Sequence, residues 1–130
     1  MEANSLQRVM MIEDDLDIQA VAQLALETLG GFTVELCSRG HEALEKAPGF
    51  GPDLILLDVM MPGMDGPTTL ERLRALPLTA RVPVVYLTAK VMPHEFDHYN
   101  TRGALDVIRK PFDPMTLSST LNTIWNQHCV

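Results

Sequence analysis

A short apolar run that ends in a single aspartate constrains this chain most. Residues Asp53–Asp58 read Asp-Leu-Ile-Leu-Leu-Asp, and a turn rich in proline and glycine follows at Val59–Gly66. The run is too short for a helix and turn residues bound it, so it predicts a buried strand of a parallel sheet. Open α/β sheets bind their ligands at the carboxyl ends of the strands. We therefore expect Asp58 to act as a metal ligand, an acid–base group or an acceptor.

The rest of the chain alternates between strand and helix patterns. Further strands are expected at 6–12, 32–37, 84–87 and 104–108, and helices at 16–29, 40–47, 67–76 and 93–101, with a last helix capped by Asp113. Pro48–Pro52 is expected to form a turn, and the thin apolar stripe of 93–101 predicts the least firmly held helix. Five strand–helix units with short connections predict an α/β fold, a doubly wound five-stranded parallel sheet with helices on both faces.

Size, composition and charge exclude several classes of protein. A length of 130 residues suits one domain that spans 1–130. No apolar run is long enough to cross a membrane and the first residues do not resemble a signal peptide, which favours the cytoplasm. Cys37 and Cys129 are then expected to be free thiols. The net charge is −7 and the basic residues are scattered apart from Arg109–Lys110, so nucleic acid is not an expected partner.

Charged and hydroxyl side chains recur where the predicted strands end. The first strand is followed by an acidic run, the third ends in an aspartate, the fourth in a threonine and the fifth in a lysine: Glu13, Asp14, Asp15, Asp58, Thr88 and Lys110. In a parallel sheet these ends lie along one edge. Carboxylates brought together repel one another, so their ionised forms require a cation. Oxygen ligands and few protein ligands favour Mg²⁺.

This set of residues matches the needs of a phosphoryl group. Mg²⁺ and Lys110 would neutralise its charge, and Thr88 would donate a hydrogen bond. Asp58 could then act as the nucleophile and form an aspartyl phosphate. Each residue also has a structural interpretation, because acidic residues after a strand often cap the next helix and a strand-end threonine or a lysine before proline often belongs to a loop. Their joint occurrence favours the functional interpretation.

In these motifs the chain resembles the receiver domains of two-component response regulators, which share the flavodoxin-like doubly wound fold. The resemblance covers about residues 8–125 and rests on five motifs: Met11–Asp15, Leu56–Gly66, Leu87–Ala89, Gly103–Ala104 and Lys110–Phe112. It implies that Asp58 accepts a phosphoryl group from a sensor histidine kinase or a histidine phosphotransfer protein. The chain would then be a phosphoacceptor rather than an enzyme. The sequence does not identify its downstream target. It also leaves open whether the chain is a whole protein or part of a longer one, and whether it forms a homodimer.

The resemblance also implies a role for each site residue. Glu13 and Asp14 would form the acidic pair, with Asp14 as a direct Mg²⁺ ligand beside Asp58. Met60 would lend its backbone carbonyl to the metal. Thr88 and Lys110 would bind the phosphoryl oxygens, and the Lys110–Pro111 peptide would be cis.

Three positions that vary within the family bear on how the signal is transmitted and on how long the phosphoryl group lasts. Val107 stands where many receivers carry Tyr or Phe, three residues before the lysine. We therefore expect phosphorylation to reorder mainly the loop after Thr88 and the helix at 93–101. By the resemblance, Met60 and Lys90 overlook the water that would hydrolyse the phosphoryl group. Neither is a good acceptor for that water, so slow self-dephosphorylation is expected.

Two other classes of protein fit this sequence less well. A phosphohydrolase with an aspartate nucleophile is the first, but the haloacid-dehalogenase pattern requires a second aspartate at the position of Met60. A nucleotide- or flavin-binding domain is the second, but its phosphate-binding loop is rich in Gly, Ser or Thr, whereas Glu13–Asp15 would repel phosphate without a metal.

Overall fold

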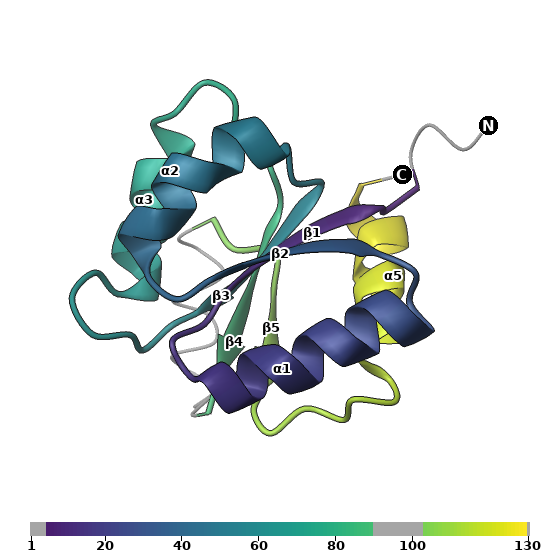
Figure 1. The fold of residues 1–130 in the computed structure, drawn as a ribbon. Helices are drawn as coiled ribbons and strands as arrows, with labels where there is room; N and C mark the ends of the chain where they lie inside the picture. Colours follow the sequence, from purple (N-terminus) through teal and green to yellow (C-terminus); the bar gives the residue numbers. More distant parts are fainter. Residues whose placement is uncertain (1–4, 90–102, 130) are drawn as a thin grey trace.

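The computed structural model describes residues 5–89 and 103–129 (Figure 1). Its elements are β1 (Arg8–Ile12), α1 (Leu16–Leu24), η1 (Ala25–Leu29), β2 (Thr33–Cys37), α2 (Gly40–Phe50), β3 (Leu54–Asp58), α3 (Gly66–Arg74), β4 (Val84–Thr88), β5 (Asp106–Arg109) and α5 (Leu117–His128). The helix expected at 93–101 lies outside the described residues, as does Lys90.

The strands form one parallel sheet in the order β2-β1-β3-β4-β5. Helices α1 and α5 cover one face of this sheet, and α2 and α3 cover the other (Figure 1). The doubly wound parallel sheet with helices on both faces is thus confirmed. The strand order reverses between β1 and β3, and such a switch point leaves a crevice outside the carboxyl ends of the two strands.

Alternating side chains of the strands divide the core into two halves. On β1, Met10 and Ile12 pack toward α2 and α3, whereas Val9 and Met11 pack toward α1 and α5. All five residues of β3 are buried, as expected for a central strand covered on both faces. The inner side predicted for the last helix is also confirmed, because its apolar residues join the same half of the core: Leu117, Leu121, Ile124 and Trp125.

Helix α2 runs three residues further than the sequence predicts. It continues through Pro48 to Phe50, so the turn expected at Pro48–Pro52 is wrong for its first three residues. The Arg8 side chain explains the extension, because its Nε donates to the Phe50 carbonyl at 2.9 Å and its guanidinium lies 4.3 Å from the Phe50 ring centre. A contact from β1 thus holds the last turn after the proline. Gly51, with φ of +67°, then ends the helix.

The last helix begins later than the sequence predicts. Asp113 does not cap α5, which starts at Leu117. The Asp113 side chain instead accepts a hydrogen bond from the Met115 backbone N–H at 2.9 Å, and its carbonyl accepts from Thr116 at 3.1 Å. A turn therefore precedes the helix, and the Asp113 carboxylate oxygen that was expected to cap the helix accepts a hydrogen bond within this turn instead.

The first helix ends in a π-helical turn, η1, over Ala25–Leu29. The Ser118 hydroxyl of α5 donates to the Ala25 carbonyl at 3.2 Å, which satisfies a backbone acceptor of this wider turn. Both cysteines are free, as predicted. Within 5–89 and 103–129, no helix is both long and apolar enough to cross a membrane.

Candidate functional site

The structure brings the predicted strand-end residues together at the switch point of the sheet. Glu13 and Asp14 directly follow β1, and Asp58 is the last residue of the neighbouring strand β3. Thr88 ends β4 and is buried. Lys110 follows β5, and its backbone N–H donates to the Thr88 carbonyl at 2.8 Å. The Lys110–Pro111 peptide is cis, as expected.

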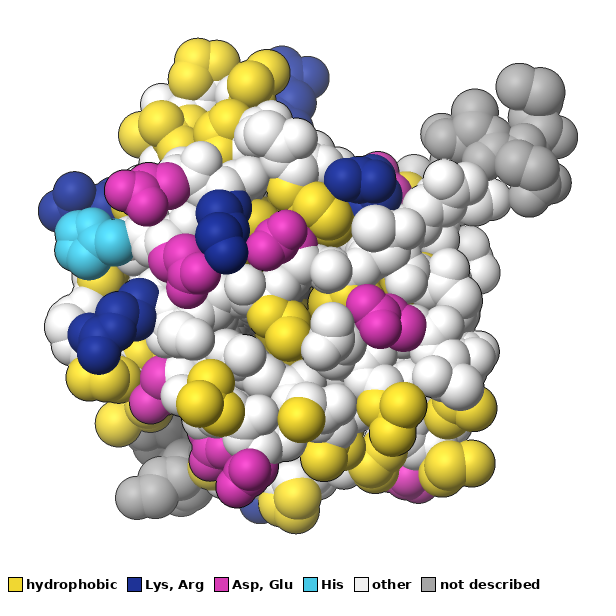
Figure 2. All heavy atoms as spheres, viewed as in Figure 1, with side chains coloured by type: hydrophobic (Ala, Val, Ile, Leu, Met, Phe, Trp, Pro, Cys, Tyr) yellow, Lys and Arg dark blue, Asp and Glu magenta, His cyan; other side chains and the backbone are white. Residues whose placement is uncertain are grey.

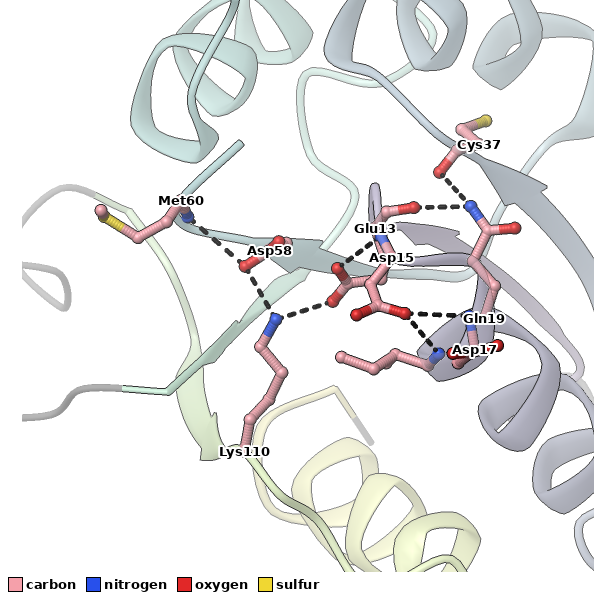
Figure 3. Close-up of polar contacts among 9 residues, drawn as sticks. Glu13, Asp15, Asp17, Gln19, Cys37, Asp58, Met60 and Lys110 are labelled. Carbon is pink, nitrogen blue, oxygen red and sulfur yellow. Dashed lines mark hydrogen bonds and ion pairs between the residues drawn. The ribbon is translucent and has the colours of Figure 1, made fainter. Parts of the chain in front are cut away.

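Lys110 joins two buried carboxylates at the centre of the site (Figure 3). Its Nζ lies 2.9 Å from Glu13 Oε1 and 3.3 Å from Asp58 Oδ1. Glu13 is 1 % exposed and Asp58 is 2 % exposed. One ammonium therefore faces two buried carboxylates, so this group of three carries one uncompensated negative charge when all are ionised.

The buried charges shift the pKa of Asp58 and of Lys110. Burial, and next the negative charge of Glu13, raise the pKa of Asp58 to about 7, although Lys110 acts in the opposite direction. For Lys110, burial alone would lower the pKa, but the hydrogen bond to Glu13 and the charge of Asp58 outweigh it and the pKa is raised. Lys110 thus stays charged, and Asp58 lacks enough positive charge around it.

A cation fits this arrangement. One carboxylate oxygen from each of Glu13, Asp14 and Asp58 lies within 4.8 Å of the others. Asp58 Oδ2 is buried and has no hydrogen-bond partner among the described residues. Asp14, in contrast, is exposed to solvent. Hard oxygen ligands with an open side toward water are the donor set that Mg²⁺ accepts.

The turn after β3 is fixed close to the site. The Met60 backbone N–H points at Asp58 Oδ1 over 3.4 Å, whereas the Met60 side chain is 76 % exposed and extends away from the carboxylates (Figure 3). Gly66 closes the turn by donating to the Val59 carbonyl at 2.9 Å. A Cβ at Gly66 would lie 2.5 Å from the Asp58 carbonyl oxygen, so only glycine allows this approach. The Met60 side chain therefore does not cover the site in this structure.

A buried glutamine, which the sequence reasoning missed, supports the acidic loop. Gln19 of α1 donates from Nε2 to the Glu13 carbonyl at 2.5 Å, the Cys37 carbonyl at 3.3 Å and the Ser38 hydroxyl at 3.2 Å. Its role had no signal in the sequence, because only the structure shows that Gln19 lies on the inner side of the helix. Asp15 accepts from the backbone N–H groups of residues 17 and 18, so it is the helix cap that the structural interpretation allowed.

Comparisons with known proteins agree with this geometry. The family model of the response regulator receiver domain matches residues 9–122. The regulatory protein PhoP of Bacillus subtilis is 37 % identical over 119 residues, which are 90 % of this chain and 48 % of PhoP. The chain spans about half the length of the first curated relatives that it matches.

Two solved structures illustrate the likeness in three dimensions. The chemotaxis protein CheY4 of Vibrio cholerae has a TM-score of 0.85 at 30 % identity, over 92 % of this chain and 99 % of CheY4. The receiver domain of the sensor histidine kinase PA1611 of Pseudomonas aeruginosa has a TM-score of 0.81 at 29 % identity, over 94 % of this chain and 99 % of that domain. That structure holds a magnesium ion in its active-site cleft.

The fold and the site thus define a class of protein, the two-component signalling proteins with an acidic cluster at the switch point of a parallel sheet. Within that class, this chain belongs to the response regulator receiver domain family.

Proposed function

We propose that Asp58 accepts a phosphoryl group from a phosphohistidine of a sensor histidine kinase or a histidine phosphotransfer protein. In this step a carboxylate oxygen of Asp58 forms a bond to phosphorus and the phosphorus–nitrogen bond of the donor breaks. The electron pair of that bond stays on the imidazole nitrogen, which takes up a proton. The domain then holds an aspartyl phosphate until it is hydrolysed or passed on.

The surroundings of Asp58 carry this proposal. Its Oδ1 is held by the Lys110 ammonium, whereas its buried Oδ2 has no hydrogen-bond partner in the described chain. A fixed carboxylate with one oxygen that is not engaged in a hydrogen bond is suited to attack phosphorus. Lys110 already lies beside that carboxylate, so it can neutralise the incoming oxygens, and the buried Thr88 hydroxyl ends the adjacent strand.

Magnesium is the proposed cofactor. Glu13, Asp14 and Asp58 would hold it together with the Met60 carbonyl, and Mg²⁺ would supply charge neutralisation for the phosphoryl group. The Asp14→Ala variant should therefore bind Mg²⁺ at least about tenfold more weakly, which corresponds to ~1.4 kcal/mol. Asp15→Asn is the control, because asparagine caps a helix as well as aspartate does. An unchanged Mg²⁺ affinity of Asp14→Ala in a metal titration would place the ligand at another residue.

Small phosphodonors test the acceptor directly. Wild-type protein with Mg²⁺ and labelled phosphoramidate should take up one acid-stable, base-labile label per chain. Asp58→Asn should fold and take up none. Asp65→Asn is the matched control, because Asp65 caps α3 from an exposed position and should leave labelling intact. Label that persists in Asp58→Asn would refute the proposed acceptor, and continuous release of phosphate from added phosphomonoesters would support a hydrolase instead.

We also propose three broader properties of the protein. A role as acceptor rather than enzyme, a single receiver domain over 1–130 and a cytoplasmic location come from the sequence. Signalling through the loop after Thr88 is also a prediction, since residues 90–102 lie outside the described part. The described residue Val107 is half-buried and packs against the core beside α2 and α3.

A further inference from the structure

The first helix buries a polar side chain and leaves apolar ones exposed. Val21 and Leu24 of α1 are 44 % and 66 % exposed, and Figure 2 shows hydrophobic side chains gathered over α1 along the lower edge of the view. The residues that α1 buries are Gln19 and Ala22. A buried amide costs free energy unless it is hydrogen-bonded, so the burial of Gln19 needs a reason other than the packing of apolar surface.

The Gln19 amide joins the ends of two neighbouring strands (Figure 3). Its Nε2 donates at 2.5 Å to the carbonyl of Glu13, which follows β1, and at 3.3 Å to the carbonyl of Cys37, which ends β2. The Ser38 hydroxyl accepts from the same nitrogen at 3.2 Å. The amide therefore ties the acidic loop, which we define as Glu13–Asp15, to a second strand.

Gln19 also holds the other side of the acidic loop. Its backbone N–H donates to the Asp15 carbonyl at 3.0 Å. One residue of α1 thus brackets Asp14, with a hydrogen bond to the carbonyl before it and another to the carbonyl after it. The Cys37 carbonyl also accepts from the Glu13 backbone N–H at 2.9 Å and would keep that bond if the amide were lost. We therefore expect a loss of the amide to act mainly on the peptide group between Glu13 and Asp14.

The position of the Asp14 carboxylate depends on this peptide group. The Asp14 side chain is exposed, so packing does not hold it, whereas Glu13 is fixed by Lys110 at 2.9 Å and by the Asp15 N–H at 3.1 Å. Because the peptide group is planar, a fixed Glu13 carbonyl also fixes the direction in which the chain enters Asp14. One carboxylate oxygen each of Glu13, Asp14 and Asp58 lies within 4.8 Å of the others. These carboxylates repel one another, so a loop without the restraint would move Asp14 away.

We propose that Gln19 is a positioning residue of the metal site. Its amide holds the acidic loop in the shape that places the Asp14 carboxylate beside Asp58, and so raises the affinity for Mg²⁺. This inference rests on the proposed binding of Mg²⁺ by these carboxylates. Groups that orient metal ligands without touching the metal typically change metal affinity by about 10- to 100-fold. Gln19 acts on the loop backbone rather than on a ligand atom, so we expect a smaller change of about fivefold.

Three variants test this role in Mg²⁺ titrations by calorimetry. Gln19→Leu keeps the approximate size of the side chain and removes its donors, and Gln19→Lys restores N–H donors at a similar reach. Thr79→Val is the control for a lost buried hydrogen bond. The Thr79 hydroxyl donates to the Leu73 carbonyl at 2.6 Å, in the loop before β4 and at the opposite edge of the sheet from the carboxylates. Urea unfolding without metal measures the stability of each variant, and each titration is made where the variant is folded.

We expect the Kd for Mg²⁺ to rise about fivefold in Gln19→Leu and to stay within about twofold of wild type in Gln19→Lys and Thr79→Val. The Mg²⁺ concentration that half-saturates labelling by phosphoramidate should rise by the same factor in Gln19→Leu. The labelling rate at saturating Mg²⁺ should stay within about twofold of wild type, because bound metal restores the loop.

Wild-type Mg²⁺ affinity in Gln19→Leu would overturn the inference, as would an equal loss of affinity in Thr79→Val or no recovery in Gln19→Lys. If Gln19→Leu does not fold, Gln19→Met takes its place with the same expected results, because methionine adapts to irregular surroundings. A wild type that binds no Mg²⁺ would instead overturn the proposed metal site itself.

Discussion

Removing the charge of Asp58 should stabilise the metal-free protein, and the gain should grow with pH. In the folded protein the pKa of Asp58 is raised from 3.8 to about 7, first by burial and then by the charge of Glu13. The folded state therefore holds a proton that the unfolded state has already released between about pH 4 and pH 7. Because the unfolded state binds fewer protons in this window, the free energy of unfolding falls as pH rises through it.

The size of the effect follows from the shift. A difference of about three pKa units corresponds to ~4 kcal/mol when the site stays dry and rigid. Water and counter-ions that enter the open side near the exposed Asp14 reduce this destabilisation. We therefore expect the ionised Asp58 to lower the free energy of unfolding by about 2 kcal/mol. Asp58→Asn keeps the shape of the side chain but does not titrate. It should match wild type at about pH 3, below the unfolded pKa, and exceed it by about 2 kcal/mol at pH 8.

Urea unfolding in the presence of a metal chelator measures this difference. The fluorescence of Trp125, the only tryptophan of the chain, reports the transition. Asp65→Asn is the control for the loss of one carboxylate elsewhere. At pH 8, saturating Mg²⁺ should stabilise wild type more than Asp58→Asn, because only wild type retains the full set of carboxylates. Parallel pH profiles of wild type and Asp58→Asn from pH 4 to pH 8 would refute the reasoning.

Two further predictions concern the rim of the site. Gly66→Ala places a Cβ 2.5 Å from the Asp58 carbonyl oxygen. It should lower the free energy of unfolding by about 1–3 kcal/mol in urea titrations, whereas Gly49→Ala, with no atom within 4 Å of its new Cβ, should be neutral or stabilising. A stable Gly66→Ala would show that the turn can move. The double variant Met60→Asn with Lys90→Glu adds acceptors for the attacking water and should speed loss of the phosphoryl group about tenfold, or ~1.4 kcal/mol of barrier. Decay at the wild-type rate or slower would contradict the sequence argument about these two positions.

The sheet and the site could be predicted because both depend on simple patterns. Each strand is a short apolar run, and each functional residue stands directly after one. Asp58 and Lys110, which are 52 residues apart, meet at 3.3 Å because parallel strands end at one edge. The positions of the strand ends in the sequence were therefore enough to predict that the two side chains lie close together.

Features that depend on contacts between distant elements could not be predicted. Helix α2 extends past Pro48 because Arg8 of another strand binds Phe50. The π-helical turn has its Ala25 carbonyl satisfied by Ser118 from the last helix. Neither partner is near in the sequence, so local propensity gave no sign of them.

Helical spacing also failed to show which apolar residues are covered. Ala22 and Val21 both fitted the stripe of the first helix, but Ala22 is buried and Val21 is 44 % exposed. The inner side instead includes the polar Gln19, whose amide holds the Glu13 carbonyl. Spacing identifies an apolar helix, whereas the neighbouring elements decide which side faces the core.

The identity of the phosphorylated residue tests the account most directly. Wild-type protein is phosphorylated with phosphoramidate and Mg²⁺, the acyl phosphate is reduced with borohydride, and the peptides are analysed by mass spectrometry. Reduction converts a phosphorylated aspartate into homoserine. We predict homoserine at position 58 alone, and none without Mg²⁺. Homoserine at Asp14, Asp15 or another carboxylate, with residue 58 still aspartate, would contradict the central claim.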